Sequence, residues 1–203
     1  MSERHQDTHA LDAFMRQRSS GGQHDGDVHA LVHRGFTVHN LRLRNPDATN
    51  AFATCHLPAP PANNEWSCAA GSIYWLGPDE WLLVCPEGVS PPEPVSAEPS
   101  SEPMTVNDLT GGWVMMTLSG PGTRPLLERG CPMDLDPAAM GGGQCAQTLL
   151  AKSPVLLAAH ADPNKITLLV RRSFAEYVAL WLAHTGETFG MTFSFEPDGT
   201  DGS

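Results

Sequence analysis

The sequence predicts an α+β fold made of two similar strand–helix–hairpin units. Similar residue types recur at two offsets along the chain. At an offset of 75 (118 − 43), the pairs are Leu43–Leu118, Pro46–Pro121 and Phe52–Leu127. At an offset of 85 (163 − 78), they are Pro78–Pro163, Asp79–Asn164, Trp81–Ile166 and Val84–Leu169. Two offsets imply an insertion of about ten residues, which loops tolerate. Chance recurrence of common helix-start and turn residues is the alternative. Each unit alone would leave one sheet face uncovered, so we expect the two units to pack into one body.

The composition supports this fold class and excludes others. Nineteen glycines and 18 prolines among 203 residues favour many turns and short elements over a helical bundle. A hydrophobic fraction of 40% with 17% charged residues is typical of a globular protein. With 12 basic against 23 acidic residues the net charge is −11, which argues against general nucleic-acid binding and against binding to anionic membranes.

The sequence also predicts a soluble, cytoplasmic protein. No apolar run approaches the roughly 18–20 residues that span a bilayer. The polar stretch over residues 1–20 lacks the apolar core of a secretion signal. Five widely spaced cysteines without a C-x-x-C pair are typical of reduced thiols: Cys55, Cys68, Cys85, Cys131 and Cys145.

Residues 1–34 are expected to form a polar tail. Five of the nine histidines lie there: His5, His9, His24, His29 and His33. Leu11, Phe14 and Met15 are spaced for one short amphipathic turn that docks on another surface. The folded domain is expected over residues 35–195, with halves 35–85 and 104–195, and a polar tail follows over 196–203.

The first half shows a strand, a helix and a hairpin. An apolar run over 36–43 predicts the strand. Asn45 and Pro46 are a typical helix cap and first helical residue, and they precede apolar residues at helical spacing. Strands over 72–76 and 80–85 flank the turn sequence Gly-Pro-Asp, which predicts a hairpin.

A Pro/Glu-rich linker is predicted over residues 86–103. It holds six prolines, four glutamates and no basic or aromatic residue, so an extended, solvated connection is expected.

The second half repeats the pattern. Two short strands, around Val106 and Leu109 and over 114–118, precede a helix that begins at Ser119-Gly120-Pro121 and ends near Gly130. Strands over 149–159 and 166–170 are predicted around a turn at 161–164.

The last predicted helix begins at a capping box. Ser173 and Glu176 have the S-x-x-E spacing, and Gly186 provides a stop. One face of this helix is expected to carry Phe174, Tyr177, Val178 and Trp181. A final strand is predicted over 189–195.

The candidate metal and phosphate sites are weak. His29 and His33 are four residues apart, but their segment runs into a strand and has no acidic or cysteine partner at a familiar spacing, so solvated histidines are the simpler interpretation. The glycines at 141–143 are not followed by Gly-Lys-Ser/Thr, and no G-x-G-x-x-G follows a strand. Gly111-Gly112 is more simply a tight turn.

The candidate nucleophiles and acids are equally incomplete. Ser119 lacks the first glycine of a nucleophile elbow, and a helix-cap role explains it. Cys131 has no recognisable histidine partner and is expected to be a buried thiol. Asp134 and Asp136 are interpreted as a turn rather than an acid–base pair. Catalytic, cofactor-binding and metal-binding residues are therefore all predicted to be none.

Tryptophans and arginines offer possible contacts with a partner. Trp75 and Trp81 flank one hairpin turn, where they either pack in the core or anchor a partner. Arg171 and Arg172 end a strand and either pair with a partner carboxylate or remain solvated.

Several motifs together resemble the gamma subunit of bacterial heterotetrameric sarcosine oxidase. The resemblance covers about residues 35–195 and is carried by the segments LGPDEWLL (76–83), LSGP (118–121), GCPMDL (130–135), CAQT (145–148) and VRRSFAEY (170–177). It implies a fold like the folate-binding domain of glycine-cleavage aminomethyltransferases, itself a duplicated α+β unit.

The resemblance also implies a function. The assembled enzyme has alpha, beta, gamma and delta subunits and oxidises sarcosine to glycine. FAD, FMN, NAD, tetrahydrofolate and zinc lie on the other subunits, and the gamma subunit carries no known catalytic residue. This chain is then a structural subunit that covers the flavin-bearing chains through an apolar surface containing tryptophan. The family commonly has a helix where this chain has the linker 86–103, which leaves one packing surface of the first half open.

Two alternatives remain. One is a stand-alone folate-dependent one-carbon transferase with the same fold, which would need a carboxylate that the sequence does not identify. The other is a gamma subunit of a related complex that acts on another N-methylated amine.

Overall fold

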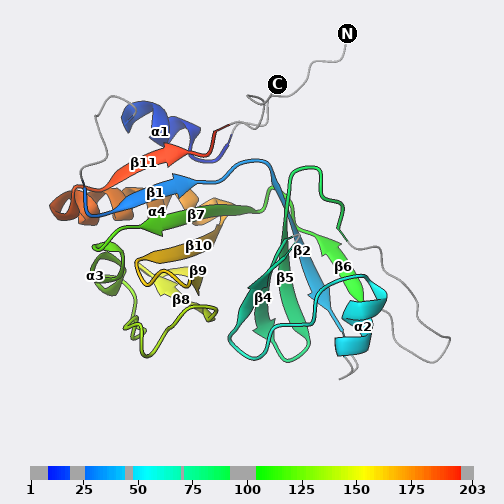
Figure 1. Ribbon diagram of the computed structural model, residues 1–203. Coiled ribbons are helices and arrows are strands. Elements are labelled where there is room, and N and C mark those ends of the chain that lie inside the picture. Colours follow the sequence, from blue (N-terminus) through cyan, green and yellow to red (C-terminus); the bar gives the residue numbers. More distant parts are fainter. Residues whose placement is uncertain (1–8, 19–25, 44–47, 70, 92–103, 198–203) are drawn as a thin grey trace, which may run out of the picture.

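Two β-sheets pack face to face and carry helices on their outer faces (Figure 1). The computed structural model describes residues 9–18, 26–43, 48–69, 71–91 and 104–197. The larger sheet has the strand order β11 (Thr192–Phe195), β1 (His29–Val32), β7 (Trp113–Ser119), β10 (Lys165–Arg171), β9 (Ser153–Ala159), β8 (Cys145–Leu150). The smaller sheet has the order β3 (Trp66–Cys68), β4 (Ser72–Gly77), β5 (Glu80–Pro86), β2 (Phe36–Arg42), β6 (Thr105–Asp108).

Three apolar cores hold these layers together. The largest lies between the larger sheet and the helices α1 (Asp12–Arg18), α3 (Thr123–Glu128) and α4 (Arg172–Thr185). A second lies between the smaller sheet and α2 (Ala48–Thr54). The third fills the space between the two sheets, where Tyr74 and Leu82 meet Leu156 and Leu169. Alternate residues of each central strand therefore serve different cores, as the two-residue period of a strand requires.

The predicted internal repeat is present, and the strand that precedes each unit joins the sheet of the other unit. The unit β2–α2–β4–β5 corresponds to β7–α3–β9–β10, and β5 and β10 lie at an offset of 85 (165 − 80). In each sheet the first strand of the unit pairs antiparallel with the last, as β2 does with β5 and β7 with β10. β1, which precedes β2 in sequence, pairs with β7, whereas β6, which precedes β7, pairs with β2. Each half therefore completes the sheet of the other half.

Residues 1–34 contain structured elements where the sequence predicted a polar tail. α1 forms at the predicted amphipathic turn, and Leu11 and Phe14 bury their side chains in the largest core. β1 lies between β7 and β11 in the larger sheet. The sequence pattern missed β1 because its partners lie more than 80 residues further along the chain. Residues 1–8 and 19–25 lie outside the described residues.

The strand predicted over 149–159 is a hairpin of two strands. Ala151 and Lys152 separate β8 from β9 with φ angles of 50° and 73°. Two consecutive positive φ angles are those of a type I′ turn, which usually carries Asn-Gly. Alanine and lysine give no such signal, so the sequence did not reveal the turn.

The last helix differs from the prediction in its cap and its face. The residue that caps α4 is Arg171, so Ser173 lies inside the helix and the predicted capping box is wrong. The buried face consists of Ala175, Val178, Ala179, Leu182 and Ala183. Phe174 and Tyr177 are instead exposed. Gly186 caps the helix end as predicted, but a 3-10 helix (η1, Gly186–Phe189) then precedes a last strand that begins only at Thr192.

The other predicted elements form close to their expected bounds. They are β2, the β4–β5 hairpin, α2, β6, β7, α3 and β10. Asn45 and Pro46, most of the linker (92–103) and the last residues (198–203) lie outside the described residues. Among the helices that the structure describes, none is long and apolar enough to cross a membrane.

Candidate functional site

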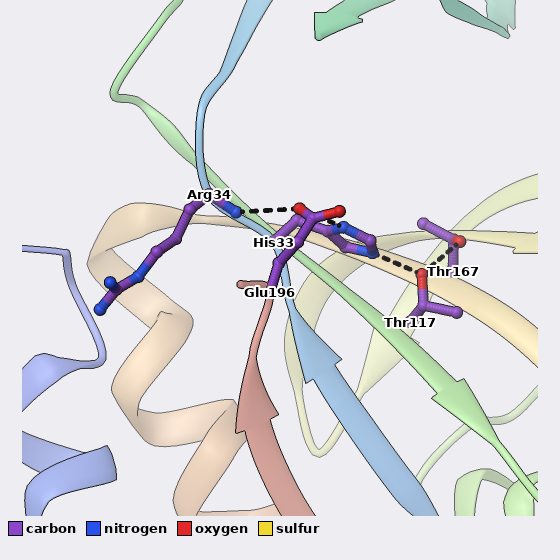
Figure 2. Close-up of polar contacts among 5 residues, drawn as sticks. All are labelled: His33, Arg34, Thr117, Thr167 and Glu196. Atoms are coloured by element: carbon purple, nitrogen blue, oxygen red, sulfur yellow. Dashed lines mark hydrogen bonds and ion pairs between the residues drawn. The ribbon is translucent and has the colours of Figure 1, made fainter. Parts of the chain in front are cut away.

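A cluster of polar side chains joins β1, β7 and the segment after β11 (Figure 2). His33, directly after β1, has its Nδ1 atom 3.0 Å from Oε2 of Glu196 and its Nε2 atom 2.7 Å from Oγ1 of Thr117. β1 and β11 run parallel, so His33 and Glu196 follow the same ends of neighbouring strands. Thr117 comes from β7, on the other side of β1.

The cluster continues across the larger sheet to a second histidine. Oγ1 of Thr117 lies 3.1 Å from Oγ1 of Thr167 on β10, and that oxygen lies 2.8 Å from Nε2 of His160. A carboxylate only accepts, so His33 donates its Nδ1–H to Glu196, and in this tautomer Nε2 accepts from Thr117. Thr167 then donates to Thr117, and His160 donates to Thr167. In this row of five side chains, from His160 to Glu196, each threonine hydroxyl donates its one proton toward Glu196.

Arg34 holds Glu196 from the other side. Its backbone N–H donates to Oε2 of Glu196 at 3.4 Å, and its guanidinium pairs with Asp12 of α1 at 3.1 Å. The same guanidinium lies 3.7 Å from the centre of the Phe195 ring. This residue therefore links α1, β1 and β11 at the edge of the cluster.

The Glu196–His33–Thr117 row has the connectivity of a carboxylate–base–nucleophile relay. A nucleophile must meet its substrate, but Thr117 is only 7% exposed and Thr167 is only 4% exposed. The Thr117 oxygen is also shared with Thr167. The row therefore satisfies buried hydroxyl groups and connects four strands, and it does not present an attacking oxygen.

A cleft of about 700 Å³ opens beside this cluster, between the two sheets. His33 and Glu196 line one wall, and Phe36, Met115, Cys68 and Glu87 are among the other lining residues. The lining of the cleft thus combines apolar surface with two carboxylates, a histidine and Arg34.

Burial changes the proton affinity of the second histidine. Desolvation, followed by the charge of Lys165, lowers the pKa of His160. Trp66 packs its ring edge-on against His160, with centroids 4.9 Å apart, and excludes water there. The lowered pKa favours the neutral imidazole, which still donates to Thr167 in its Nε2–H tautomer.

His29 and His33, two of the histidines expected in a polar tail, have partners inside the fold, whereas His5 and His24 lie outside the described residues. His29 bonds to Thr192 Oγ1 at 2.9 Å and to Ser194 Oγ at 3.0 Å, so it joins β1 to β11 as His33 does. No group of three or more metal-binding side chains occurs in the described part of the chain. The two histidines act as structural side chains, and the solvated interpretation was wrong.

Ser119 and Cys131 both have structural roles. Ser119 ends β7, and the residue that caps α3 is Gly122 without a side-chain bond, so the predicted cap role of Ser119 is wrong. Cys131 is buried as predicted, with its sulfur 3.7 Å from the Thr148 hydroxyl.

The acidic segment and the Gly111-Gly112 pair form turns as predicted. Asp134 and Asp136 each accept a bond from a backbone N–H two residues further on, at 2.9 and 2.8 Å. Gly111, with φ of 78°, lies in the turn between β6 and β7. Gly143, with φ of 87°, lies just before β8.

The tryptophans lie inside or against the cores; Trp81 is buried and the other four are half-buried, so the expected tryptophan-containing surface stays a prediction. Trp81 is buried and packs on Phe52, and Trp75 contacts two cores. Arg171 lies over the ring of Trp113 at 4.1 Å, so its partner is an aromatic ring of its own chain. The large apolar side chains exposed in the described residues are Val89, Leu149, Phe174, Tyr177 and Leu180.

Sequence reasoning missed Thr117, Thr167, His160 and Glu196. Glu196 had been placed in the C-terminal tail, and its partner His33 lies 163 residues away. The two threonines were the available signal, because each interrupts an otherwise apolar strand, and the β7–β10 register places them opposite each other.

A model of the sarcosine oxidase gamma subunit family matches residues 47–187 of the chain. Sarcosine oxidase subunit gamma of Corynebacterium sp. (strain P-1) is 38% identical over 111 residues, which are 55% of this chain and 54% of that protein. The subunit of Corynebacterium sp. (strain U-96) is 32% identical over 126 residues, 62% of this chain and 61% of that protein. The matched part thus spans about half to three fifths of these curated relatives.

Solved structures show the same fold. A chain of heterotetrameric sarcosine oxidase from Corynebacterium sp. U-96 superposes with a TM-score of 0.73 at 24% identity, covering 91% of this chain and 97% of that chain. Aminomethyltransferase T of the glycine cleavage system from Bartonella henselae gives a TM-score of 0.51 at 11% identity, covering 91% of this chain and 50% of that chain. The predicted α+β fold class and its likeness to these aminomethyltransferases are confirmed.

Proposed function

The chain belongs to the sarcosine oxidase gamma subunit family, and on this basis we propose that it is a non-catalytic structural subunit of a heterotetrameric sarcosine oxidase complex. The observation that carries the proposal is the family match over residues 47–187, which runs through both sheets and the helices of both units. The polar cluster supports it, because its only internal hydroxyls are buried and already shared.

The proposed complex contains alpha, beta and delta subunits beside this chain and works in the cytoplasm. It oxidises the N-methyl group of sarcosine, passes two electrons to oxygen and produces glycine and hydrogen peroxide. The one-carbon unit passes to tetrahydrofolate or leaves as formaldehyde. In this proposal FAD, FMN, NAD, tetrahydrofolate and zinc belong to the partner subunits. The proposal is supported by His29 and His33, which bond to hydroxyl and carboxylate groups of their own chain.

The native mass and visible absorbance of the assembly recovered on this chain from its own host test the proposal. We expect a four-component complex whose flavin absorbance stays with the other chains when this chain is separated. A single colourless species would contradict the proposal.

A stand-alone folate-dependent transferase is the second candidate, favoured by the aminomethyltransferase-like fold and the cleft of about 700 Å³. Calorimetric titration of the isolated chain with tetrahydrofolate distinguishes the two functions. The structural subunit gives no binding heat, whereas the transferase gives saturable binding that Glu196→Gln, at the wall of the cleft, weakens.

A further inference from the structure

The outer edge of β8 is an open strand edge beyond Cys145, whereas Glu65 bridges Gln144 just before the strand. β8 ends the larger sheet and pairs with β9 on one side only. Ala159 donates its N–H to Gln144 O, which places Gln144, Ala146 and Thr148 in the bonded positions of the ladder. The residues between these positions direct their backbone N–H and C=O groups away from β9, toward the outer edge of the sheet. Cys145 confirms this, because its outward N–H donates to Asn64 O at 2.7 Å.

Gln147 and Leu149 are the next two outward positions. Within the described residues, the structure gives their backbone N–H and C=O groups no partner in another segment. β8 has the sequence CAQTLL, without a charged residue or proline. Such residues commonly protect exposed edges against pairing with another chain. This edge lacks them, and Leu149 adds an apolar side chain that is 46% exposed.

An exposed apolar stripe on α4 begins beside this edge. Phe174, Tyr177 and Leu180 are spaced three residues apart on the outer face of the helix, and each is at least 42% exposed. The Tyr177 hydroxyl donates to Ala151 O, in the turn that ends β8, at 2.8 Å. Four of the five large apolar side chains exposed in the described residues thus lie on β8 or α4.

The chemistry of this surface selects its occupant. Open N–H and C=O groups in a strand edge are satisfied by the backbone of an extended polypeptide, and apolar side chains on that segment cover Leu149 and Tyr177. A second copy of this chain is disfavoured, because each copy carries a net charge of −11 and two copies repel each other.

We propose that the edge of β8 and the α4 stripe form the docking surface for an extended segment of a different subunit, which adds a strand to the larger sheet beside β8. This inference rests on the proposed function, since it requires an assembly. It adds to that function the surface of this chain that binds the other subunit.

Gln147→Pro tests the strand pairing directly. Proline removes the outward N–H but leaves the bonds between β8 and β9, so the chain itself is expected to fold. Gln147→Ala is the matched control, because it loses the same side-chain bond to Leu76 O and keeps the N–H. Leu149→Lys is a second variant that leaves the backbone unchanged, and Val89→Lys controls for adding a charge at an exposed apolar residue.

Each variant is produced as a tagged full-length chain in the protein's own host and purified by the tag. The amount of each co-purified partner chain per tagged chain is then measured. We expect Gln147→Pro and Leu149→Lys to reduce partner recovery at least tenfold, while the two controls match the wild type. Hydrogen exchange at the Gln147 and Leu149 amides is expected to slow at least tenfold in the wild-type assembly relative to the isolated chain.

Wild-type recovery by both edge variants, or unprotected amides in an intact assembly, would overturn the docking surface and leave the proposed function standing. A homodimer of the isolated chain that Gln147→Pro dissociates would overturn it in favour of a second copy. A wild-type chain that recovers no partner would instead contradict the proposed function.

Discussion

His33 and Glu196 join the two ends of the described fold. Their Nδ1 and Oε2 atoms lie 3.0 Å apart although 163 positions separate them in sequence. The pair holds β1 and β11 side by side, and both strands then extend the sheet beyond β7. Glu196 is 41% exposed, whereas the His33 imidazole also accepts a hydrogen bond from the buried Thr117 hydroxyl. The two partners therefore contribute differently to stability.

Replacing each partner of this pair separates those contributions. Glu196→Ala removes a half-exposed hydrogen bond from His33, worth about 1 kcal/mol or less. His33→Ala leaves the buried Thr117 hydroxyl without its acceptor, which costs about 1–3 kcal/mol. Urea unfolding of both variants measures the difference, with His184→Ala, an exposed histidine 3.9 Å from Glu187, as the control. Equal losses for His33→Ala and Glu196→Ala would show that the hydroxyl needs no acceptor.

The lowered pKa of His160 predicts an acid-sensitive fold. Its folded-state pKa lies below the unfolded value of about 6.5, so the unfolded state binds more protons as the pH falls. The stabilisation is complete above about pH 6.5 and is lost as the pH falls toward and through the folded-state pKa. Unfolding free energies of wild type and His160→Gln between pH 5 and 8 test this. The variant should lose less stability on acidification, with a remaining slope from His9 and His39, whose pKa values burial also lowers. Identical slopes would contradict the assignment.

Position 120 requires glycine for two reasons, a positive φ angle and the close approach of neighbouring backbone. Its φ is 110°, and a Cβ atom there would lie 2.3 Å from Asp27 O. We expect Gly120→Ala to cost more than about 3 kcal/mol or to prevent folding, since the clash is with backbone. Gly88→Ala is the matched control, because Gly88 also has a positive φ, of 81°, but nothing lies within 4 Å of its Cβ position. Its cost should be only about 1–2 kcal/mol. Thermal unfolding compares them, and a similar loss for both would exclude the clash.

The cysteines should differ sharply in reactivity. Cys68 is exposed at the cleft, and the other four are buried. Desolvation raises the pKa of Cys145 to about 11, so at pH 8 only about one molecule in a thousand carries its thiolate. Iodoacetamide followed by mass spectrometry should show one fast modification that Cys68→Ser abolishes. Fast labelling of Cys145 in the folded chain would contradict the described burial.

The sequence predicted elements whose signals are local. The β4–β5 hairpin, with its Gly-Pro-Asp turn, and the apolar face behind Pro46 both appear where expected. The repeat was visible because helix starts and turns use few residue types. The type I′ turn at Ala151-Lys152 was missed, because its residues are not those that favour positive φ.

The strand exchange and the polar cluster had no local signal. β1 pairs with residues beyond position 110, and nothing in a four-residue strand specifies so distant a partner. Thr117 and Thr167 become a connected pair only when β7 and β10 align in register. Glu196 follows the last strand, and its role depends on the parallel pairing of β11 with β1. Such long-range relationships arise from packing rather than from sequence patterns.

The proposed function requires that this chain support an oxidase without taking part in its chemistry. Thr117→Val tests it most directly, because valine has nearly the shape of threonine but lacks the hydroxyl that bonds to His33, the partner of Glu196. Sarcosine-dependent oxygen uptake per flavin is measured on the assembled complex carrying wild type or Thr117→Val. We expect turnover numbers within about twofold of each other, with at most a lower yield of complex. A hundredfold loss of turnover in a fully assembled, flavin-loaded complex would show that the Glu196–His33–Thr117 row is catalytic.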